Sequence, residues 1–324
     1  MCTGLTLQNG SFYFGRNLDL DYEFGQQVVI TPRNYPITYK KQATQTNHLA
    51  LIGMATVVDD YPLYAEAVNE AGVGIAGLNF PGFASYAQSL VADKENITPY
   101  ELPLYLLGQC QTVAAIKAKL AELNIVALDF NDQMPCAPLH WLIADAKQAI
   151  VVEVVAGEIK VYDNPVGVLT NSPSFDYHLM NLHAYLGLNP KQPDDQLTKQ
   201  ALKPYGEGLG TRGLPGDFSP ASRFIKAVYL KNNVKAKPTE AENIASFFHI
   251  LDSVAFVKGA TITSQQTHDI TLYSCCVNAD TGDYYYKTYT NNQISCVSLR
   301  KVNLDSANLL CYPLQVQQQI AQIN

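Results

Sequence analysis

The chain has 324 residues, of which 47% are hydrophobic and 16% are charged, and its formal net charge is −7. This composition is typical of a globular protein with a substantial core and excludes an intrinsically disordered chain. No run of lysine and arginine marks a nucleic-acid surface, and no apolar run approaches the roughly 20 residues of a membrane span, so we expect neither kind of partner.

The seven cysteines are an odd number, and no export signal precedes them. A secretory leader has a basic start, an apolar run and a small-residue cleavage site. We therefore expect reduced thiols in a cytoplasmic protein rather than a disulfide framework.

The first predicted element is a β-hairpin over residues 3–8 and 11–15. Asn9-Gly10 between these segments favours a two-residue turn with positive φ. The hairpin returns the segment FGRNLDLD to the beginning of the chain.

This turn sets Cys2 opposite Asn17. Side chains alternate between the two faces of a strand, so Asp19 is expected on the face of Cys2 and Arg16 on the opposite face. A bulge at Gly15 would shift the register and turn Arg16 toward Cys2.

The rest of the chain predicts antiparallel strands in runs and helices in pairs, which indicates one α+β domain. Strands are expected over 48–58, 72–80, three segments of 140–164, 269–289 and 293–300, and helices over 98–110, 112–126, 219–233 and 239–256. The expected helix starts are Thr98 with Pro99 and Glu101, Ser219 with Pro220, and Thr239 with Glu242.

Residues 187–218 hold four prolines and have weak apolar periodicity. A structureless segment of this length is uncommon inside a compact domain. It is interpreted either as a surface loop or as an arm that packs on another subunit.

Two sequence motifs that could mark a binding site are better explained as structural features. Gly208, Gly210 and Gly213 match G-x-G-x-x-G, but no strand leads into them, so a dinucleotide site is not indicated. Cys275-Cys276 is expected to be a pair of core thiols, and no zinc motif accompanies it.

Cys2 is a candidate nucleophile because of its position. Removal of Met1 would give Cys2 a free α-amine beside its own thiol. The thiolate is a strong nucleophile, and an α-amine, with an ordinary pKa near ~8, can act as a base near neutral pH. One residue would then supply both groups. The alternative is a small residue at the start of a strand.

At this point the sequence resembles the choloylglycine hydrolases, which include the bile salt hydrolases and penicillin V acylases among the N-terminal-nucleophile hydrolases. The resemblance covers essentially the whole chain in order. Its blocks are the initial MCT, YFGRNLDLD, YPLYAEAVNEAGVGIAGLNFPG (61–82), PLHWLIAD (138–145), YDNPVGVLTNSPSFDYHL (162–179), LPGDFSPASRF (214–224) and FFHIL (247–251).

The resemblance implies a four-layer αββα sandwich as a single catalytic domain over residues 2–324. It also implies hydrolysis of a carboxamide without metal or cofactor. As in the family, we expect a homotetramer, with residues 187–205 reaching across an interface.

By motif position, Cys2 would be the nucleophile and its α-amine the proton shuttle. Asp19 would hold the amine, and Arg16 would favour the thiolate.

Two asparagines and a second arginine complete the implied site. Asn171 would donate its side-chain amide to the oxyanion, Asn79 would add its backbone N–H, and Arg223 would complete the polar cluster. Without the resemblance, these residues are interpreted as a loop turn, a strand-end turn and a solvated helix residue.

In this family the apolar part of the substrate binds between loops that follow the first hairpin and lie near residues 60, 130 and 260. Ala65 is smaller than the aromatic residue of some relatives, and Arg212 stands where a small or apolar residue is expected. The residues expected to line the pocket are Leu18, Leu20, Tyr22, Phe24, Tyr61, Ala65, Phe130, Met134 and Ala137.

The small-molecule substrate favoured by this reading is a bile salt conjugated to glycine or taurine. Asn79 stands where the penicillin acylase branch has an aromatic residue, and an apolar pocket suits a rigid steroid. Penicillin V acylase is the alternative within this class. An inactive binding protein on the same fold is the alternative in another class, and the complete polar set speaks against it.

Overall fold

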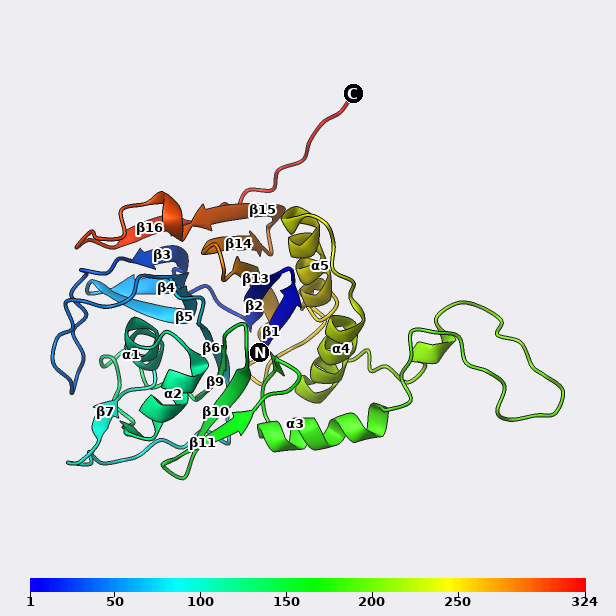
Figure 1. Ribbon diagram of the computed structural model, residues 1–324, viewed down its shortest axis with the longest axis horizontal. Helices are drawn as coiled ribbons and strands as arrows, with labels where there is room; N and C mark the ends of the chain where they lie inside the picture. Colours follow the sequence, from blue (N-terminus) through cyan, green and yellow to red (C-terminus); the bar gives the residue numbers. More distant parts are fainter.

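Two antiparallel β-sheets pack face to face, and helices cover the outer face of each sheet (Figure 1). The computed structural model describes residues 1–324. The layers confirm the expected α+β sandwich of αββα type.

The six-stranded sheet has the N-terminal hairpin near its centre. Its strands, in spatial order, are β12 (Val168–Leu169), β1 (Cys2–Asn9), β2 (Ser11–Leu20), β13 (Ile270–Asn278), β14 (Asp283–Thr288) and β15 (Asn291–Ser298).

The eight-stranded sheet contains most of the middle of the chain. Its strands, in spatial order, are β11 (Glu158–Asp163), β10 (Ala149–Val155), β9 (Leu139–Ala144), β6 (Gly74–Asn79), β5 (Tyr61–Asn69), β4 (Leu51–Val58), β3 (Gln27–Thr31) and β16 (Leu310–Pro313). A separate parallel pair is formed by β7 (Glu95–Ile97) and β8 (Leu123–Ile125).

Helices lie outside the two sheets. On the side of the eight-stranded sheet are α1 (Leu102–Gln109) and α2 (Val113–Leu120); on the side of the six-stranded sheet are α3 (Phe175–Leu182), α4 (Pro220–Asn233) and α5 (Glu240–Asp252) (Figure 1).

Two hydrophobic cores fill the spaces between these layers. One core contains Leu5 and Leu142 of the two sheets together with Phe224 of α4. The other contains Trp141 of β9 and Leu106 of α1. Because both faces of the central strands are covered, a strand such as β10 is a nearly continuous apolar run instead of an alternating one.

The register of the hairpin differs from the expected one. Asn9 pairs with Ser11 around Gly10 alone, whose φ is 75°. Cys2 therefore lies opposite Leu18 and not opposite Asn17.

A shift of one residue exchanges the two faces of a strand. Arg16, which pairs with Gly4, shares the face of Cys2, and Asp19 lies on the other face. The expected placement of these two side chains was wrong, and Arg16 reaches Cys2 without a bulge at Gly15.

The first helix begins later than expected. α1 starts at Leu102. The Glu101 carboxylate accepts the Thr98 N–H at 2.9 Å, which is its half of the expected capping box, but Oγ1 of Thr98 has no partner, so the box is incomplete. Pro103 occupies the first turn, where a backbone N–H would have no acceptor within the helix, so the missing N–H of proline costs nothing. Pro99 lies before the helix. The second helix also ends earlier, at Leu120, because the chain enters β8 three residues later.

The expected starts of the two later helices are confirmed. The Ser219 side chain accepts the Ser222 N–H at the start of α4. Thr239 and Glu242 form a reciprocal capping box at the start of α5.

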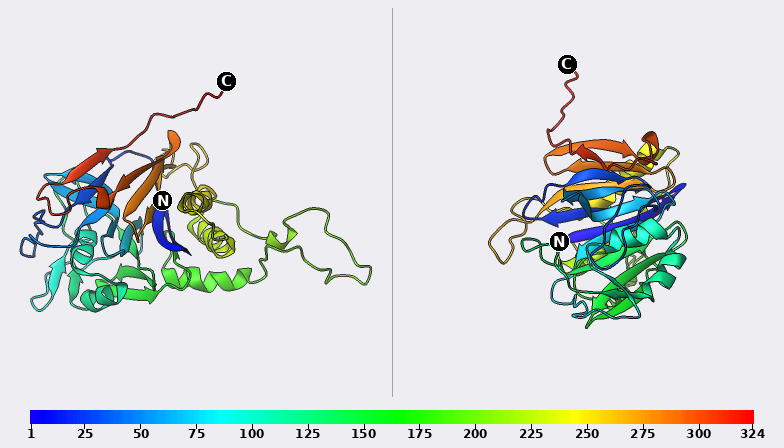
Figure 2. Two further views of the ribbon diagram at one scale, coloured as in Figure 1. Left: turned by 45° about the horizontal axis from the view of Figure 1, so that its top comes forward. Right: turned by 90° about the vertical axis from the view of Figure 1, so that its left-hand side faces the viewer.

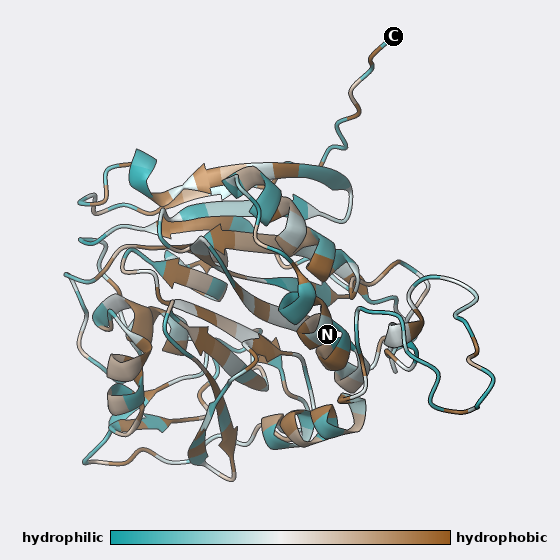
Figure 3. Cartoon of the chain, turned by 45° about the vertical axis from the view of Figure 1, so that its right-hand side comes forward, coloured by the Kyte–Doolittle hydropathy of each residue, from teal (hydrophilic) through white to brown (hydrophobic).

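Residues 187–218 form no regular element except the short 3₁₀ turn Leu209–Thr211. Part of this segment projects from the body of the molecule (Figure 2) and is mostly hydrophilic (Figure 3). Leu197 and Tyr205 are large hydrophobic side chains on this segment, and they are 90% and 89% exposed.

Candidate functional site

Cys2 begins β1 and lies between the two sheets. The face of β1 that carries Cys2 also carries Gly4, and at Gly4 this face lies against the side chains of Leu142 and Leu78 of the opposite sheet. Cys2 is 4% exposed, and its Sγ lies 2.5 Å from Nη2 of Arg16. A guanidinium at this distance stabilises a thiolate, which is the nucleophilic form of cysteine.

Arg16 is buried and held by main-chain oxygens of the opposite sheet. Its Nη1 donates to the Gly77 carbonyl at 2.5 Å and to the Ala65 carbonyl at 3.3 Å. Burial by itself lowers the pKa of Arg16, but the nearby Cys2, Tyr273 and Glu66 raise it above its ordinary value overall. Arg16 therefore remains charged beside Cys2.

Asp19 lies under the start of the chain on the other face of the hairpin. Its Oδ1 accepts a hydrogen bond from Oγ1 of Thr271 at 2.6 Å, whereas its Oδ2 is buried without a partner. Burial raises the pKa of Asp19, while Arg223 and the N-terminal ammonium oppose that increase. The site thus contains an unfilled acceptor close to the first residues.

Asn171 and Arg223 bind the main chain of Cys2. The Cys2 N–H donates to Oδ1 of Asn171 at 2.8 Å, and Nη1 of Arg223 donates to the Cys2 carbonyl at 2.5 Å. Nη2 of Arg223 also donates to Oδ1 of Asn171 at 2.8 Å. The side-chain Nδ2 of Asn171 donates to the Asn79 carbonyl at 2.8 Å.

These contacts link five of the six expected polar residues, and Asp19 joins them through the main chain of Met1. Arg223 is only 1% exposed, so its interpretation as a solvated helix residue was wrong. Burial lowers the pKa of Arg223, while the nearby Asp19, Cys2 and Asp269 oppose that decrease.

Met1 is attached in this structure and lies across the site. Its ammonium donates to the Asp19 carbonyl at 2.5 Å, and its own carbonyl accepts the Asp19 N–H at 2.9 Å. The nitrogen of Cys2 is therefore a peptide N–H, which cannot act as a base.

Six of the nine residues expected to line the apolar pocket lie near the end of β2 or on β5. Leu18 belongs to the same core as Cys2, and Leu20, Phe24 and Ala65 pack against that core. Tyr22 is 61% exposed.

The other three residues, Phe130, Met134 and Ala137, lie between β8 and β9, and Tyr61 packs with Phe130. The rings of Tyr61 and Phe130 are 5.8 Å apart, and the Phe130 N–H donates to the Met134 carbonyl at 3.0 Å. Tyr61 packs against the second core, and Ala137 is exposed. Tyr61 and its neighbours therefore do not pack against the hydrophobic core that contains Cys2.

Sequence reasoning missed several residues that support the site. Thr271 holds Asp19, Thr3 accepts a hydrogen bond from Arg223 at 2.7 Å, and Glu66 lies 3.8 Å from Arg16. Glu66 could have been noticed as a lone acid inside an apolar strand, since buried carboxylates are rare without a partner.

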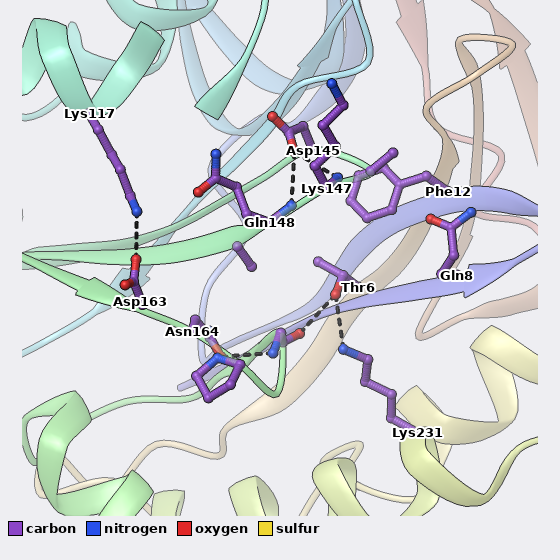
Figure 4. Close-up of a pocket in the computed structure, with 14 residues that line it drawn as sticks. Thr6, Gln8, Phe12, Lys117, Asp145, Lys147, Gln148, Asp163, Asn164 and Lys231 are labelled. Carbon is purple, nitrogen blue, oxygen red and sulfur yellow. Dashed lines mark hydrogen bonds and ion pairs between the residues drawn. The ribbon is translucent and has the colours of Figure 1, made fainter. Parts of the chain in front are cut away.

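A cavity of about 450 Å³ lies at the other end of the N-terminal hairpin (Figure 4). Thr6, Gln8, Asn164 and Lys231 are among its lining residues, and only three of the fourteen are hydrophobic. Sites for apolar ligands have mainly hydrophobic walls, so this cavity is not suited to the apolar part of a substrate.

No group of three or more His, Cys, Asp and Glu side chains is arranged to hold a metal ion. None of the helices combines the length and apolar character needed to cross a membrane.

A nearly N-terminal thiol beside an arginine, at the end of a hairpin inside an αββα sandwich, defines an amide hydrolase of the N-terminal-nucleophile class. The chain belongs to the choloylglycine hydrolase family of linear amide C–N hydrolases, whose family model matches residues 2–312.

Known relatives match the full chain. It is 45% identical to a bile salt hydrolase/transferase from Lactiplantibacillus plantarum, with 100% of both chains covered. It is 41% identical to a bile salt hydrolase/transferase from Clostridium perfringens, again with 100% of both covered.

Solved structures agree with this relationship. The conjugated bile acid hydrolase from Clostridium perfringens, in a variant whose cysteine at position 2 is replaced by alanine, has a TM-score of 0.93 at 41% identity over 100% of both chains. A penicillin V acylase from Agrobacterium tumefaciens has a TM-score of 0.78 at 17% identity, covering 98% of this chain and 94% of the acylase, and shows a shared fold alone.

Proposed function

We propose that this protein hydrolyses the amide bond between a bile acid and glycine or taurine. The reaction is supported above all by the 2.5 Å contact between Sγ of Cys2 and Nη2 of Arg16. The substrate is supported by the relatives named for bile salts, which match the whole chain at 45% and 41% identity.

The mature enzyme begins at Cys2 in this proposal. Loss of Met1 frees the α-amine of Cys2, which then becomes the donor for the unfilled Oδ2 of Asp19. An α-amine titrates near ~8, so a useful fraction is neutral and basic near pH 7.

Acylation begins when the Cys2 amine takes the proton of the Cys2 thiol, and the resulting thiolate attacks the carbonyl carbon of the substrate amide. The carbonyl electrons move onto oxygen, which accepts hydrogen bonds from Nδ2 of Asn171 and the backbone N–H of Asn79. Such donors act where negative charge develops. The intermediate then expels glycine or taurine, whose nitrogen takes a proton from the Cys2 ammonium, and a thioester remains on Cys2.

Deacylation uses the same groups in reverse. The Cys2 amine takes a proton from water as the water attacks the thioester, and collapse of this intermediate releases the bile acid and restores the thiolate. The names of two relatives also include a transferase. An amine that attacks the thioester in place of water would form a new amide, and we propose this as a second activity.

Substrate preference would come mainly from the steroid. Leu18, Leu20 and Phe24 offer apolar surface near Cys2, and burial of such surface contributes roughly 25 cal/mol per Å². Glycine and taurine conjugates are therefore expected to react within about an order of magnitude of each other.

We also propose that residues 2–324 form one catalytic domain in a homotetramer, with residues 187–205 as the arm between subunits. The exposed Leu197 and Tyr205 on that arm support this assembly. The nucleophile must remain a reduced thiol, which supports a cytoplasmic location.

The function is tested by incubating the mature protein with glycocholate, taurocholate and penicillin V and measuring the released amine. We expect the two bile salts to have the higher kcat/KM. A clear preference for penicillin V would contradict the bile-salt substrate and leave the Cys2 mechanism standing. Absence of turnover with all three would favour the inactive binding protein.

A further inference from the structure

Glu66 is a buried carboxylate that lies near Nε of Arg16, whereas Cys2 contacts Nη2 of the same arginine. It lies on β5 of the eight-stranded sheet, and its Oε2 is 3.8 Å from Nε of Arg16 on β2 of the other sheet. The side chains of Glu66 and Arg16 are 0% and 1% exposed, so water screens this ion pair very little.

The Glu66 carboxylate is held by donors from two strands of the facing sheet. The hydroxyl of Tyr273 donates to Oε2 at 2.7 Å, and the hydroxyl of Tyr284 donates to Oε1 at 2.6 Å. The Cys275 thiol donates to Oε1 at 3.5 Å. Burial raises the pKa of Glu66, while Arg16 and the two tyrosines oppose that increase.

Arg16 therefore has two acidic side chains close to its guanidinium. One is Cys2, whose Sγ contacts Nη2 of Arg16, and the other is Glu66 beside Nε. The charge on the Cys2 sulfur changes during the reaction, because a thiolate becomes a neutral thioester. A buried cation that loses its counter-charge is costly.

We propose that Glu66 is a positioning residue that serves as the permanent counter-charge of Arg16 and limits how strongly Arg16 attracts the Cys2 sulfur. This role rests on the proposed function of Cys2 as the nucleophile. While the sulfur is acylated and uncharged, Glu66 keeps Arg16 neutralised. While the sulfur is free, Glu66 shares the positive charge of Arg16 and keeps the thiolate reactive.

Removal of the Glu66 charge has two opposite effects. The Cys2 thiolate becomes the only counter-charge in contact with Arg16, so the thiolate is stabilised and persists at lower pH. Acylation then removes that contacting counter-charge, so the chemical step becomes slower. A variant that only loosened the packing would not combine a more readily ionised sulfur with slower turnover.

The test is Glu66→Gln in the mature protein. The rate of Cys2 alkylation by iodoacetamide is measured against pH, with mass spectrometry to identify the modified residue, and kcat and KM are measured with glycocholate. We expect the alkylation midpoint to fall by about 0.5–1 pH unit and kcat to fall about tenfold, with KM little changed.

Glu101→Gln is the matched control. Glu101 is also buried, but its carboxylate accepts backbone N–H groups of Lys40 and Thr98 and does not contact Arg16. We expect this control to leave the alkylation midpoint unchanged. An unchanged or raised midpoint in folded Glu66→Gln, or an equal shift in the control, would overturn the role of Glu66.

Tyr273→Phe keeps the test decisive if Glu66→Gln does not fold. This variant removes a donor that stabilises the ionised carboxylate, so the pKa of Glu66 rises further and part of its negative charge is lost to protonation. We therefore expect a smaller downward shift of the midpoint. No shift would contradict the proposal. The alkylation measurement needs no substrate, so a failure to cleave bile salts would contradict the proposed function and leave this result interpretable.

Discussion

Cys2 combines a thiol and a backbone nitrogen in one residue, and the structure shows only the thiol ready for chemistry. The nitrogen of Cys2 is held in the peptide bond to Met1 and donates to Asn171 at 2.8 Å. The proposed base therefore exists only after one bond to Met1 has been cut.

We predict that active protein lacks Met1, because only then can the Cys2 amine take a proton. Intact-mass measurement should show the loss of one methionine. Cys2→Ser should fold but lose nearly all turnover, since a hydroxyl is much harder to ionise than a thiol. A fully active preparation that retains Met1 would contradict the mechanism.

Lys231 of α4 contributes a second residue-level prediction. Its Nζ donates to Oγ1 of Thr6 at 3.0 Å and to the Val166 carbonyl at 2.5 Å, and it points toward Thr6 in Figure 4. Burial lowers the pKa of Lys231 to about 8 from an ordinary value of 10.5. Between these two values the unfolded chain binds more protons than the folded chain, so this group makes stability rise with pH.

Lys231→Met should remove that dependence. From pH 8 to 10.5, the free energy of unfolding of the wild type should increase relative to this variant by on the order of 2 kcal/mol. Urea unfolding at a series of pH values measures the difference. Lys235→Met, at an exposed position, is the control and should follow the wild type.

At the scale of elements, α4 connects a helix cap to the site. Ser219 caps the helix, and Arg223 stands near its first turn, with Nη1 2.5 Å from the Cys2 carbonyl. The cap therefore positions a side chain of the site as well as the helix.

We predict that Ser219→Ala destabilises the protein by about 1 kcal/mol, because the Ser222 N–H loses its acceptor. It should also lower kcat several-fold through the displacement of Arg223. Thr239→Ala in the capping box of α5 is the matched control, with a similar loss of stability and unchanged kcat. Urea unfolding and steady-state kinetics measure the two effects, and equal changes of kcat in both variants would refute this link.

At the scale of the whole molecule, the projecting segment leaves its hydrophobic side chains Leu197 and Tyr205 exposed, because no other part of the same chain packs on them. Its ends are held together by the Asn189 N–H, which donates to the Gly210 carbonyl at 2.9 Å. Its tip can therefore be removed without opening the base of the loop.

We predict that replacing residues 191–207 with two glycines converts a tetramer into smaller species, because Leu197 and Tyr205 lose their partner surface. Light scattering should give about four times the chain mass of 35.6 kDa for the wild type and a lower mass for the variant. The double variant Leu197→Ser and Tyr205→Ser should have the same effect in milder form. A monomeric wild type would refute the arm.

Local features were predictable from the sequence because they depend on neighbours along the chain. The caps at Ser219 and Thr239 require only a side chain and an N–H three residues away. The α+β class follows from short apolar runs separated by turns. The resemblance, carried by its motif blocks, then named the six polar residues, but it could not give their contacts.

The three-dimensional contacts were decided by the tertiary structure. The hairpin register depends on which face of each strand packs against the opposite sheet, so Arg16 and Asp19 exchanged faces when Asn9 paired with Ser11. Arg223 is buried only because α4 lies against the start of β1. The partners of Glu66 come from strands more than 200 residues further along the chain. The sequence by itself determined which chemical groups this protein possesses, and packing of distant segments decided which of them meet, because no local pattern records a contact across two sheets.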